Sequence, residues 1–114
     1  MIADDDDAIL DALGAMLEYK GYEVRPVLNG KGLTEMENEL PDLLLLDIWM
    51  SGVDGRDICK KLKAGNATSK MPIVLISASK DIHTSAMEAG ADDFLAKPFE
   101  IEELYKMIEL HTAV

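Results

Sequence analysis

The sequence lacks the features that would set it apart from an ordinary globular domain. Its 114 residues include one cysteine, Cys59, which excludes an internal disulfide and fits a reducing compartment, so we expect a cytoplasmic location. No apolar run approaches the roughly 20 residues of a membrane-spanning helix, and no basic segment followed by an apolar one opens the chain, so a secretory signal is not expected. Repeats, low-complexity linkers and breaks in composition are also missing, which predicts one domain over residues 1–114.

Positive charge is scarce. The chain carries 11 basic residues against 22 acidic ones, for a formal net charge of −11. Binding to nucleic acid or to an anionic membrane requires clustered lysine and arginine, so we expect neither. The acidic surplus favours divalent cations or the basic surface of a partner protein, although solubility alone would also explain it.

The apolar residues alternate between helical and extended patterns. In the run Leu43–Leu46, four leucines without polar alternation predict a strand buried on both faces, as in a parallel sheet. Further strands are predicted at residues 1–3, 23–27, 72–77 and 94–96, helices at 9–17, 33–40, 58–62, 82–89 and 101–108, and a loop at 51–55. This repeated order predicts an α/β fold, with a five-stranded parallel sheet and helices on both of its faces. Right-handed crossovers place the carboxyl ends of all the strands at one edge.

The ends of four predicted strands carry polar side chains. Asp4–Asp7 follow the first strand, Asp47 ends the third, Ser77 the fourth and Lys97 the fifth. Carboxylates about 4 Å apart repel each other by roughly 4 kcal/mol at an effective dielectric constant near 20, so this cluster needs a cation. An all-oxygen, partly hydrated site suits Mg²⁺, which together with Lys97 and a hydroxyl would hold the oxygens of a phosphoryl group. Asp47 is then the candidate nucleophile, forming an aspartyl phosphate.

Each of these residues also has an ordinary structural explanation. Aspartates near an N-terminus often form an acidic tail or cap a helix, and we expect Asp6 or Asp7 to be such a cap. Taken singly, Asp47 and Ser77 would be turn residues, and Lys97 would carry little information. Their joint placement at four strand ends is the observation that favours a site.

Five motifs surround these residues. They are Ala3-Asp4-Asp5-Asp6, Pro41 to Asp47, Gly52-Val53-Asp54-Gly55, Ile76-Ser77-Ala78, and Gly90 to Phe99. In this order and spacing the chain resembles, over essentially its whole length, the receiver domain of response regulators in bacterial two-component signalling. The resemblance implies a flavodoxin-like (βα)5 fold with strand order 2-1-3-4-5. It also implies that the domain is a phosphorylation-dependent switch and not an enzyme. Such a switch receives its phosphoryl group from a histidine kinase or a histidine phosphotransfer protein.

The resemblance implies roles for the metal-binding and phosphoacceptor residues. Asp4 and Asp5 correspond to the acidic pair of the family, with Asp5 the direct ligand of Mg²⁺. Asp47 corresponds to the phosphoacceptor and also to a metal ligand. The backbone carbonyl of Trp49 would supply another ligand, so its side chain is not the relevant group there.

The remaining implied roles concern the phosphoryl group and the response to it. Lys97 corresponds to the lysine that pairs with the phosphoryl oxygens, and Ser77 to the hydroxyl that bonds to the phosphoryl group and shifts in the active state. Phe94 corresponds to the switch aromatic, whose ring turns inward when Ser77 moves. The Lys97-Pro98 peptide bond is expected to be cis, as in the family.

The sequence departs from the family pattern at three places. Only three residues precede Asp4, so the first strand is shorter than in most relatives. Ser51 stands where most relatives have proline, which predicts a looser loop after Asp47. Phe94 replaces the equally common tyrosine and has no hydroxyl for a hydrogen bond in either state.

Three other functions are open at this point. A phosphatase with an aspartyl-phosphate intermediate commonly has a second aspartate two positions after the nucleophile, where this chain has Trp49. An interaction module with the same fold but no phosphorylation usually lacks one of the acids or the lysine, and this chain retains them. A tail that binds metal passively is the third alternative.

The resemblance places the output surface at the fourth helix, the fifth strand and the fifth helix. DNA-binding relatives that dimerise through this face often have basic residues near positions where this chain has Met107 and Glu109, so we expect a monomer or a weak phosphorylation-dependent dimer. Because no effector domain is present, we expect a stand-alone receiver or a piece of a longer regulator or hybrid kinase.

Overall fold

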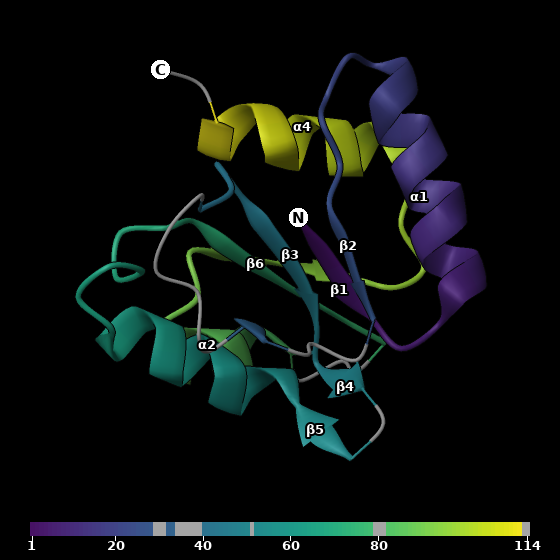
Figure 1. The fold of residues 1–114 in the computed structure, drawn as a ribbon. Helices are drawn as coiled ribbons and strands as arrows, with labels where there is room; N and C mark the ends of the chain where they lie inside the picture. The colour runs from purple at the N-terminus through teal and green to yellow at the C-terminus, as the bar shows by residue number, and fades with distance from the viewer. Residues whose placement is uncertain (29–31, 34–39, 51, 79–81, 113–114) are drawn as a thin grey trace.

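A five-stranded parallel sheet forms the centre of the protein in a computed structural model, which describes residues 1–28, 32–33, 40–50, 52–78 and 82–112 (Figure 1). The strands are β1 (Ile2–Asp4), β2 (Pro26–Leu28), β3 (Leu44–Asp47), β6 (Ile73–Ser77) and β7 (Asp93–Ala96). They pair in the order β2-β1-β3-β6-β7. This confirms the predicted order 2-1-3-4-5, because the two other strands, β4 (Trp49–Met50) and β5 (Val53–Asp54), form a separate antiparallel pair.

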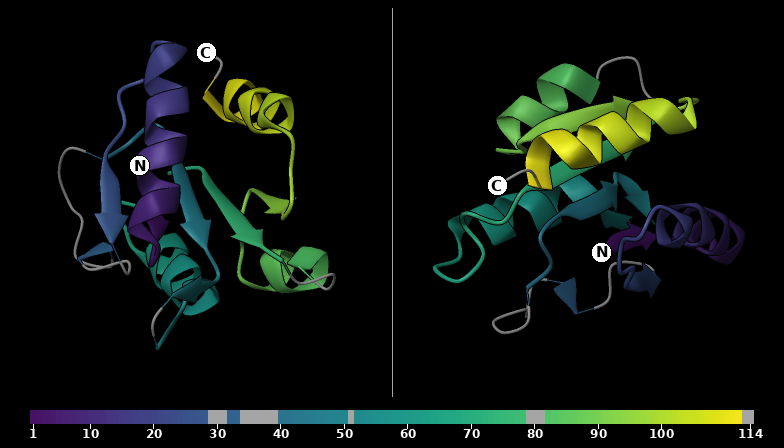
Figure 2. Two further views of the ribbon diagram at one scale, coloured as in Figure 1. Left: turned by 90° about the vertical axis from the view of Figure 1, so that its right-hand side faces the viewer. Right: turned by 90° about the horizontal axis from the view of Figure 1, so that it is seen from above.

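Helices cover both faces of the sheet (Figure 2). The helices α1 (Asp7–Tyr19) and α4 (Ile101–Thr112) pack on one face, and α2 (Gly55–Ala64) and α3 (Ile82–Glu88) pack on the other. None of these described helices is both long enough and apolar enough to cross a membrane. The helix predicted at 33–40 lies largely outside the described residues, and Ser51 with its predicted looser loop also lies outside them.

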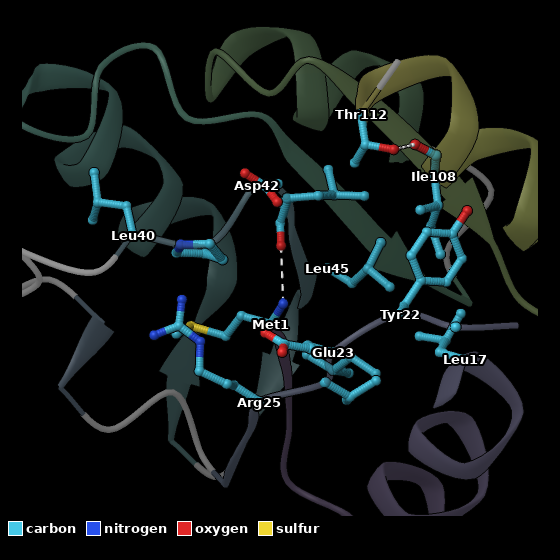
Figure 3. A pocket seen from close by; sticks show the side chains of 15 residues that line it. Met1, Leu17, Tyr22, Glu23, Arg25, Leu40, Asp42, Leu45, Ile108 and Thr112 are labelled. Atoms are coloured by element: carbon cyan, nitrogen blue, oxygen red, sulfur yellow. Dashed lines mark hydrogen bonds between the residues drawn. The ribbon is translucent and has the colours of Figure 1, made fainter. Parts of the chain in front are cut away.

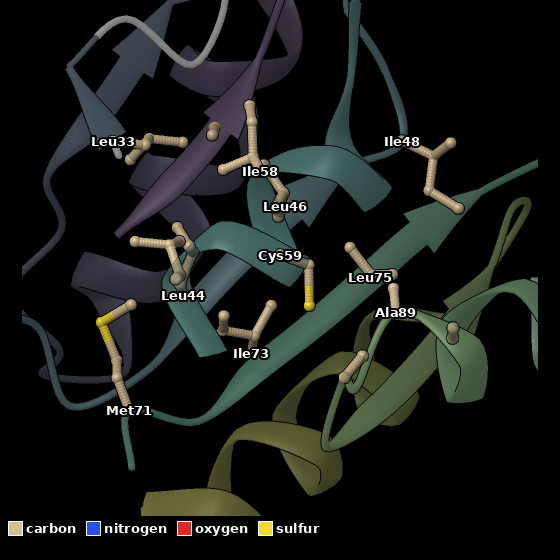
Figure 4. Close-up of a cluster of buried hydrophobic side chains, with 14 of the residues drawn as sticks. Leu33, Leu44, Leu46, Ile48, Ile58, Cys59, Met71, Ile73, Leu75 and Ala89 are labelled. Atoms are coloured by element: carbon tan, nitrogen blue, oxygen red, sulfur yellow. The ribbon is translucent and has the colours of Figure 1, made fainter. Parts of the chain in front are cut away.

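The leucine run of β3 supplies side chains to both faces, because alternate side chains of a strand point in opposite directions. Leu44 and Leu46 pack with Cys59 in the core beneath α2 and α3 (Figure 4). Leu43 and Leu45 pack in the core beneath α1 and α4. Burial raises the pKa of the Cys59 thiol to about 11, so this side chain stays protonated at neutral pH and fills the core as an apolar group.

The loop predicted at residues 51–55 is partly wrong. Trp49 pairs with Asp54 across the turn between β4 and β5, and α2 already begins at Gly55. The Asp54 side chain caps this helix by accepting a hydrogen bond from the Arg56 N–H at 2.9 Å. The sequence prediction failed here because two-residue strands leave no periodic pattern to recognise.

The strand predicted at 23–27 is displaced toward the C-terminus, to Pro26–Leu28. This edge strand pairs with the three residues of β1, and Ile2 lies opposite Pro26. The pairing partner therefore sets where β2 begins, and proline is tolerated there because it opens an edge strand.

A cavity of about 680 Å³ opens where β1 begins, between the end of α1, the segment before β2 and the segment before β3 (Figure 3). The Met1 amino group donates a hydrogen bond to the Leu43 carbonyl at 3.0 Å inside this region. Burial, assisted by the charge of Arg25 and opposed by Asp42, lowers the pKa of this amino group to about 6. Apolar side chains including Leu45 line the cavity from the sheet.

We expect an Ile-Leu extension placed before Met1 to raise the free energy of unfolding by about 2 kcal/mol, because each buried apolar side chain contributes about 1.5–3 kcal/mol. The added residues would continue β1, and the leucine, two positions before Ile2, would place its side chain on the Ile2 face, toward the cavity. A Gly-Ser extension is the matched control, since it also moves the amino group but adds no apolar side chain. Urea unfolding compares the two chains, and equal stabilities would show that the cavity does not accept the extension.

Candidate functional site

Three carboxylates converge at the carboxyl edge of the sheet. Asp4 ends β1 and Asp47 ends the neighbouring strand β3, while Asp5 follows directly after β1. One carboxylate oxygen from each of these residues lies within 4.8 Å of those of the other two. Asp4 and Asp47 are buried, at 4% and 7% exposure, and Asp5 is exposed. The strand-end placement predicted from the sequence therefore brings these acids together.

The turn from β1 into α1 fixes the acidic pair. The Asp4 carboxylate accepts a hydrogen bond from the Asp6 N–H at 3.1 Å. Asp6 in turn caps α1, since its carboxylate accepts from the N–H groups of Ala8 and Ile9 at 2.9 and 3.4 Å. The cap predicted at Asp6 or Asp7 is therefore Asp6, and Asp7 is the first residue of the helix.

Lys97 brings a positive charge to the acids from the end of β7. Its Nζ lies 3.7 Å from Asp4 Oδ2 and 3.7 Å from Asp47 Oδ1. Its backbone N–H donates to the Ser77 carbonyl at 2.9 Å, and the Lys97-Pro98 peptide bond is cis, as predicted. The ammonium thus lies between two carboxylates at ion-pair distance, but beyond the 2.7–3.2 Å range of a direct hydrogen bond.

The pKa of Asp47 is raised above its ordinary value. Burial is the largest cause, Lys97 acts in the opposite direction, and the charges of Asp4 and Asp5 add to the rise. A hydrogen bond from the Trp49 backbone N–H lowers the pKa without reversing the shift. Lys97 therefore offsets the negative charge of ionised Asp47 only in part, and an added cation would stabilise the ionised carboxylate.

Ser77 and Phe94 lie on the neighbouring strands β6 and β7. Asp47 pairs with Ile76, so Ser77 is one position farther along the adjacent strand, and its side chain is buried. Phe94 lies opposite Leu75 and packs, half-buried, against the core beneath α2 and α3. The two residues predicted to form the switch therefore occupy adjacent strands, with Ser77 near the acids and Phe94 toward the opposite end of β7.

Sequence reasoning missed the contacts that fix the segment after Asp47, from β4 to the start of α2. A Cβ on Gly55 would lie 2.3 Å from the Asp47 carbonyl oxygen, so only glycine allows α2 to begin so close to β3. Next to it, the Arg56 guanidinium pairs with Asp54 and lies over the ring of Trp49. An aspartate before glycine at a helix start was the available signal, because it combines a cap with a close approach.

The donor set fits a hard divalent cation. It consists of carboxylate oxygens of Asp4, Asp5 and Asp47, to which the neighbouring Trp49 carbonyl would add another oxygen. Among the described residues, three carboxylates face the single ammonium of Lys97, which leaves an excess of two negative charges when all are ionised. Oxygen ligands and excess negative charge are what Mg²⁺ requires.

A doubly wound parallel sheet with clustered aspartates and a lysine at its carboxyl edge defines a class of signalling domains. The model of the family "Response regulator receiver domain" matches residues 1–109. The chain belongs to the response regulator receiver domain family, whose members are typically signalling proteins of two-component systems.

The relatives agree with this assignment. A Synechocystis protein, "DNA-binding dual master transcriptional regulator RpaA", is 36% identical over 107 residues, which cover 91% of this chain and 44% of that protein. The chain therefore spans less than half the length of such curated relatives. A crystal structure described as a response regulator from Chloroflexus aurantiacus is 38% identical, with a TM-score of 0.88 and coverage of 99% of this chain and 95% of that one.

A further solved structure is the receiver domain of a sensor histidine kinase from Pseudomonas aeruginosa. It is 25% identical to this chain, with a TM-score of 0.88, and covers 99% of this chain and 95% of its own. That structure contains a magnesium ion coordinated in its active-site cleft.

Proposed function

We propose that this domain is a phosphorylation-dependent switch in which Asp47 accepts a phosphoryl group from a histidine kinase or a histidine phosphotransfer protein. The observation that carries the proposal is the convergence of Asp4, Asp5 and Asp47, with Lys97 Nζ 3.7 Å from two of them, in a member of the receiver family. Asp47 is the acceptor because it ends the central strand, where it pairs with Ile76 of β6.

Mg²⁺ is the proposed cofactor. Asp5, Asp47 and the Trp49 carbonyl would hold it directly, and Asp4 would complete the acidic pair. The magnesium ion in the Pseudomonas receiver domain supports this assignment. When bound, the ion supplies positive charge that offsets the carboxylates and the phosphoryl oxygens.

The protein residues contribute positioning and charge to the transfer. A carboxylate oxygen of Asp47 attacks the phosphorus as the bond from phosphorus to the donor imidazole nitrogen breaks, and the product is an acyl phosphate on Asp47. The Lys97 ammonium pairs with a phosphoryl oxygen, for which it only has to leave its shared position between two carboxylates. Attack of water on the phosphorus later releases inorganic phosphate and restores the carboxylate.

The response to phosphorylation would run through Ser77 and Phe94. The Ser77 hydroxyl donates a hydrogen bond to a phosphoryl oxygen, and the half-buried Phe94 ring turns farther into the space that this movement vacates. Such a change biases an equilibrium between two conformations. The surface that changes is formed by α3, β7 and α4, which correspond to the fourth helix, the fifth strand and the fifth helix predicted from the sequence. This surface would contact an effector, or would bind a second copy weakly.

Mass spectrometry after incubation with a small-molecule phosphodonor and Mg²⁺ tests the proposal. We expect one added phosphoryl group on the wild-type chain and none on Asp47→Asn. Asp11→Asn is the matched control, because it removes an exposed aspartate of α1 and should leave the adduct intact. An adduct that persists in Asp47→Asn would place the acceptor elsewhere, and absence of any adduct would favour an interaction module that is not phosphorylated.

A further inference from the structure

The β4–β5 pair connects the phosphoacceptor to the start of α2 (Figure 1). Trp49 lies opposite Asp54 in this pair, and its backbone N–H donates a hydrogen bond to the Asp47 carboxylate. The Trp49 side chain is 62% exposed, so the core does not hold it. Because an isolated two-stranded pair is marginally stable, side-chain contacts around it decide how firmly its backbone is fixed.

Met50 holds β4 to the core from its buried side, and Arg56 supplies the contacts on the exposed side. Its Nε lies 3.0 and 3.2 Å from the two carboxylate oxygens of Asp54, and its Nη2 lies 2.7 Å from Oδ2 of the same group. The guanidinium also lies over the Trp49 ring, 5.2 Å from the ring centroid. Each of these three residues therefore contacts the other two. Trp49 pairs with Asp54 through the backbone, Asp54 forms a forked ion pair with Arg56, and Arg56 makes a cation–π contact with Trp49.

We propose that Arg56 is a positioning residue of the cation site and acts through Trp49. The inference rests on the proposed function, in which the Trp49 carbonyl is a Mg²⁺ ligand. The N–H of Trp49 faces Asp47, and its carbonyl would face the cation, so a shift of this one residue disturbs two contacts of the site. Loss of an outer contact that orients a ligand typically weakens metal binding by about 10–100-fold. We expect the lower end of this range because the ring is mostly exposed.

The sign of the effect separates positioning from simple electrostatics. If the positive charge of Arg56 acted only through its field, its removal would strengthen the binding of a divalent cation. Positioning predicts weaker binding instead. Lys61 is the matched control, because it is exposed on the same helix and forms no hydrogen bond or ring contact with Trp49 in the described part of the chain.

Isothermal titration calorimetry with MgCl₂ at constant ionic strength measures the affinity of each variant. We expect the dissociation constant to rise about tenfold in Arg56→Ala, and no rise in Lys61→Ala. Arg56→Lys should show most of the same loss, because lysine keeps the charge but lacks the planar fork. This second variant still tests the inference if α2 frays in Arg56→Ala. Thermal unfolding without Mg²⁺ checks that each chain is folded. Unchanged or tighter binding by both Arg56 variants would overturn the inference.

A double-mutant cycle tests whether the effect passes through the indole. We expect Trp49→Ala to weaken Mg²⁺ binding as Arg56→Ala does, and the double variant to bind no more weakly than either single variant. Fully additive losses would overturn the route through Trp49. The proposed function fails separately, and this inference with it, if the wild-type chain binds no Mg²⁺ or if Asp5→Asn binds as tightly as wild type.

Discussion

Replacing Gly55 with alanine is expected to lower the free energy of unfolding by about 3 kcal/mol, the upper part of the usual range for forcing an atom into packed structure. The new Cβ would lie 2.3 Å from the Asp47 carbonyl oxygen and 3.0 Å from the Ile48 Cα. These are backbone atoms, which cannot turn aside as the end of a flexible side chain can. The Gly55 N–H also donates to the Ile48 carbonyl at 2.7 Å, so moving α2 away would stretch this bond.

Gly14→Ala is the matched control for this substitution, and its effect should have the opposite sign. Gly14 lies within α1, and a Cβ there would meet Val24 at an ordinary contact distance of 3.7 Å. Alanine stabilises a helix interior by roughly 0.5–1 kcal/mol relative to glycine. Urea unfolding of both variants gives the comparison, and a Gly55→Ala chain as stable as wild type would show that α2 does not depend on this close approach.

Replacing Asp47 with asparagine should change stability in opposite directions with and without Mg²⁺. In its absence we expect the variant to be the more stable chain at pH 7, because burial and the nearby acids disfavour the ionised carboxylate of wild-type Asp47. With Mg²⁺ at about 100 times its dissociation constant, the wild-type chain gains about 2.7 kcal/mol. The variant, which lacks a ligand, should lose most of this gain.

The pH dependence of the same comparison follows from the direction of the shift. The folded-state pKa of Asp47 is raised above its ordinary value of 3.8. The stability that this group contributes is therefore fully present below pH 3.8 and is lost as the pH rises through the folded-state pKa. The advantage of Asp47→Asn should thus grow with rising pH and vanish in acid. Denaturant unfolding in EDTA from pH 3 to pH 7 checks this, with Asp11→Asn as the control, and a gap independent of pH would contradict it.

The residues alone determined the succession of strands and helices along the chain and the location of the site. Continuous apolar runs such as Leu43–Leu46 identify buried parallel strands, because both faces of such a sheet are covered. Parallel strands bring their carboxyl ends to one edge, so the sequence assigns Asp4, Asp47 and Lys97 to one location. The same local rules limited the cap of the first helix to Asp6 or Asp7.

Only the tertiary structure decided how these groups act on one another. The equal 3.7 Å distances from Lys97 to Asp4 and Asp47 depend on the packing of strands from opposite ends of the chain. The contact of Gly55 with β3 and the stacking of Arg56 on Trp49 depend on where α2 is placed. Local propensity cannot encode such contacts, because their energies arise between segments whose relative position is set by the whole core.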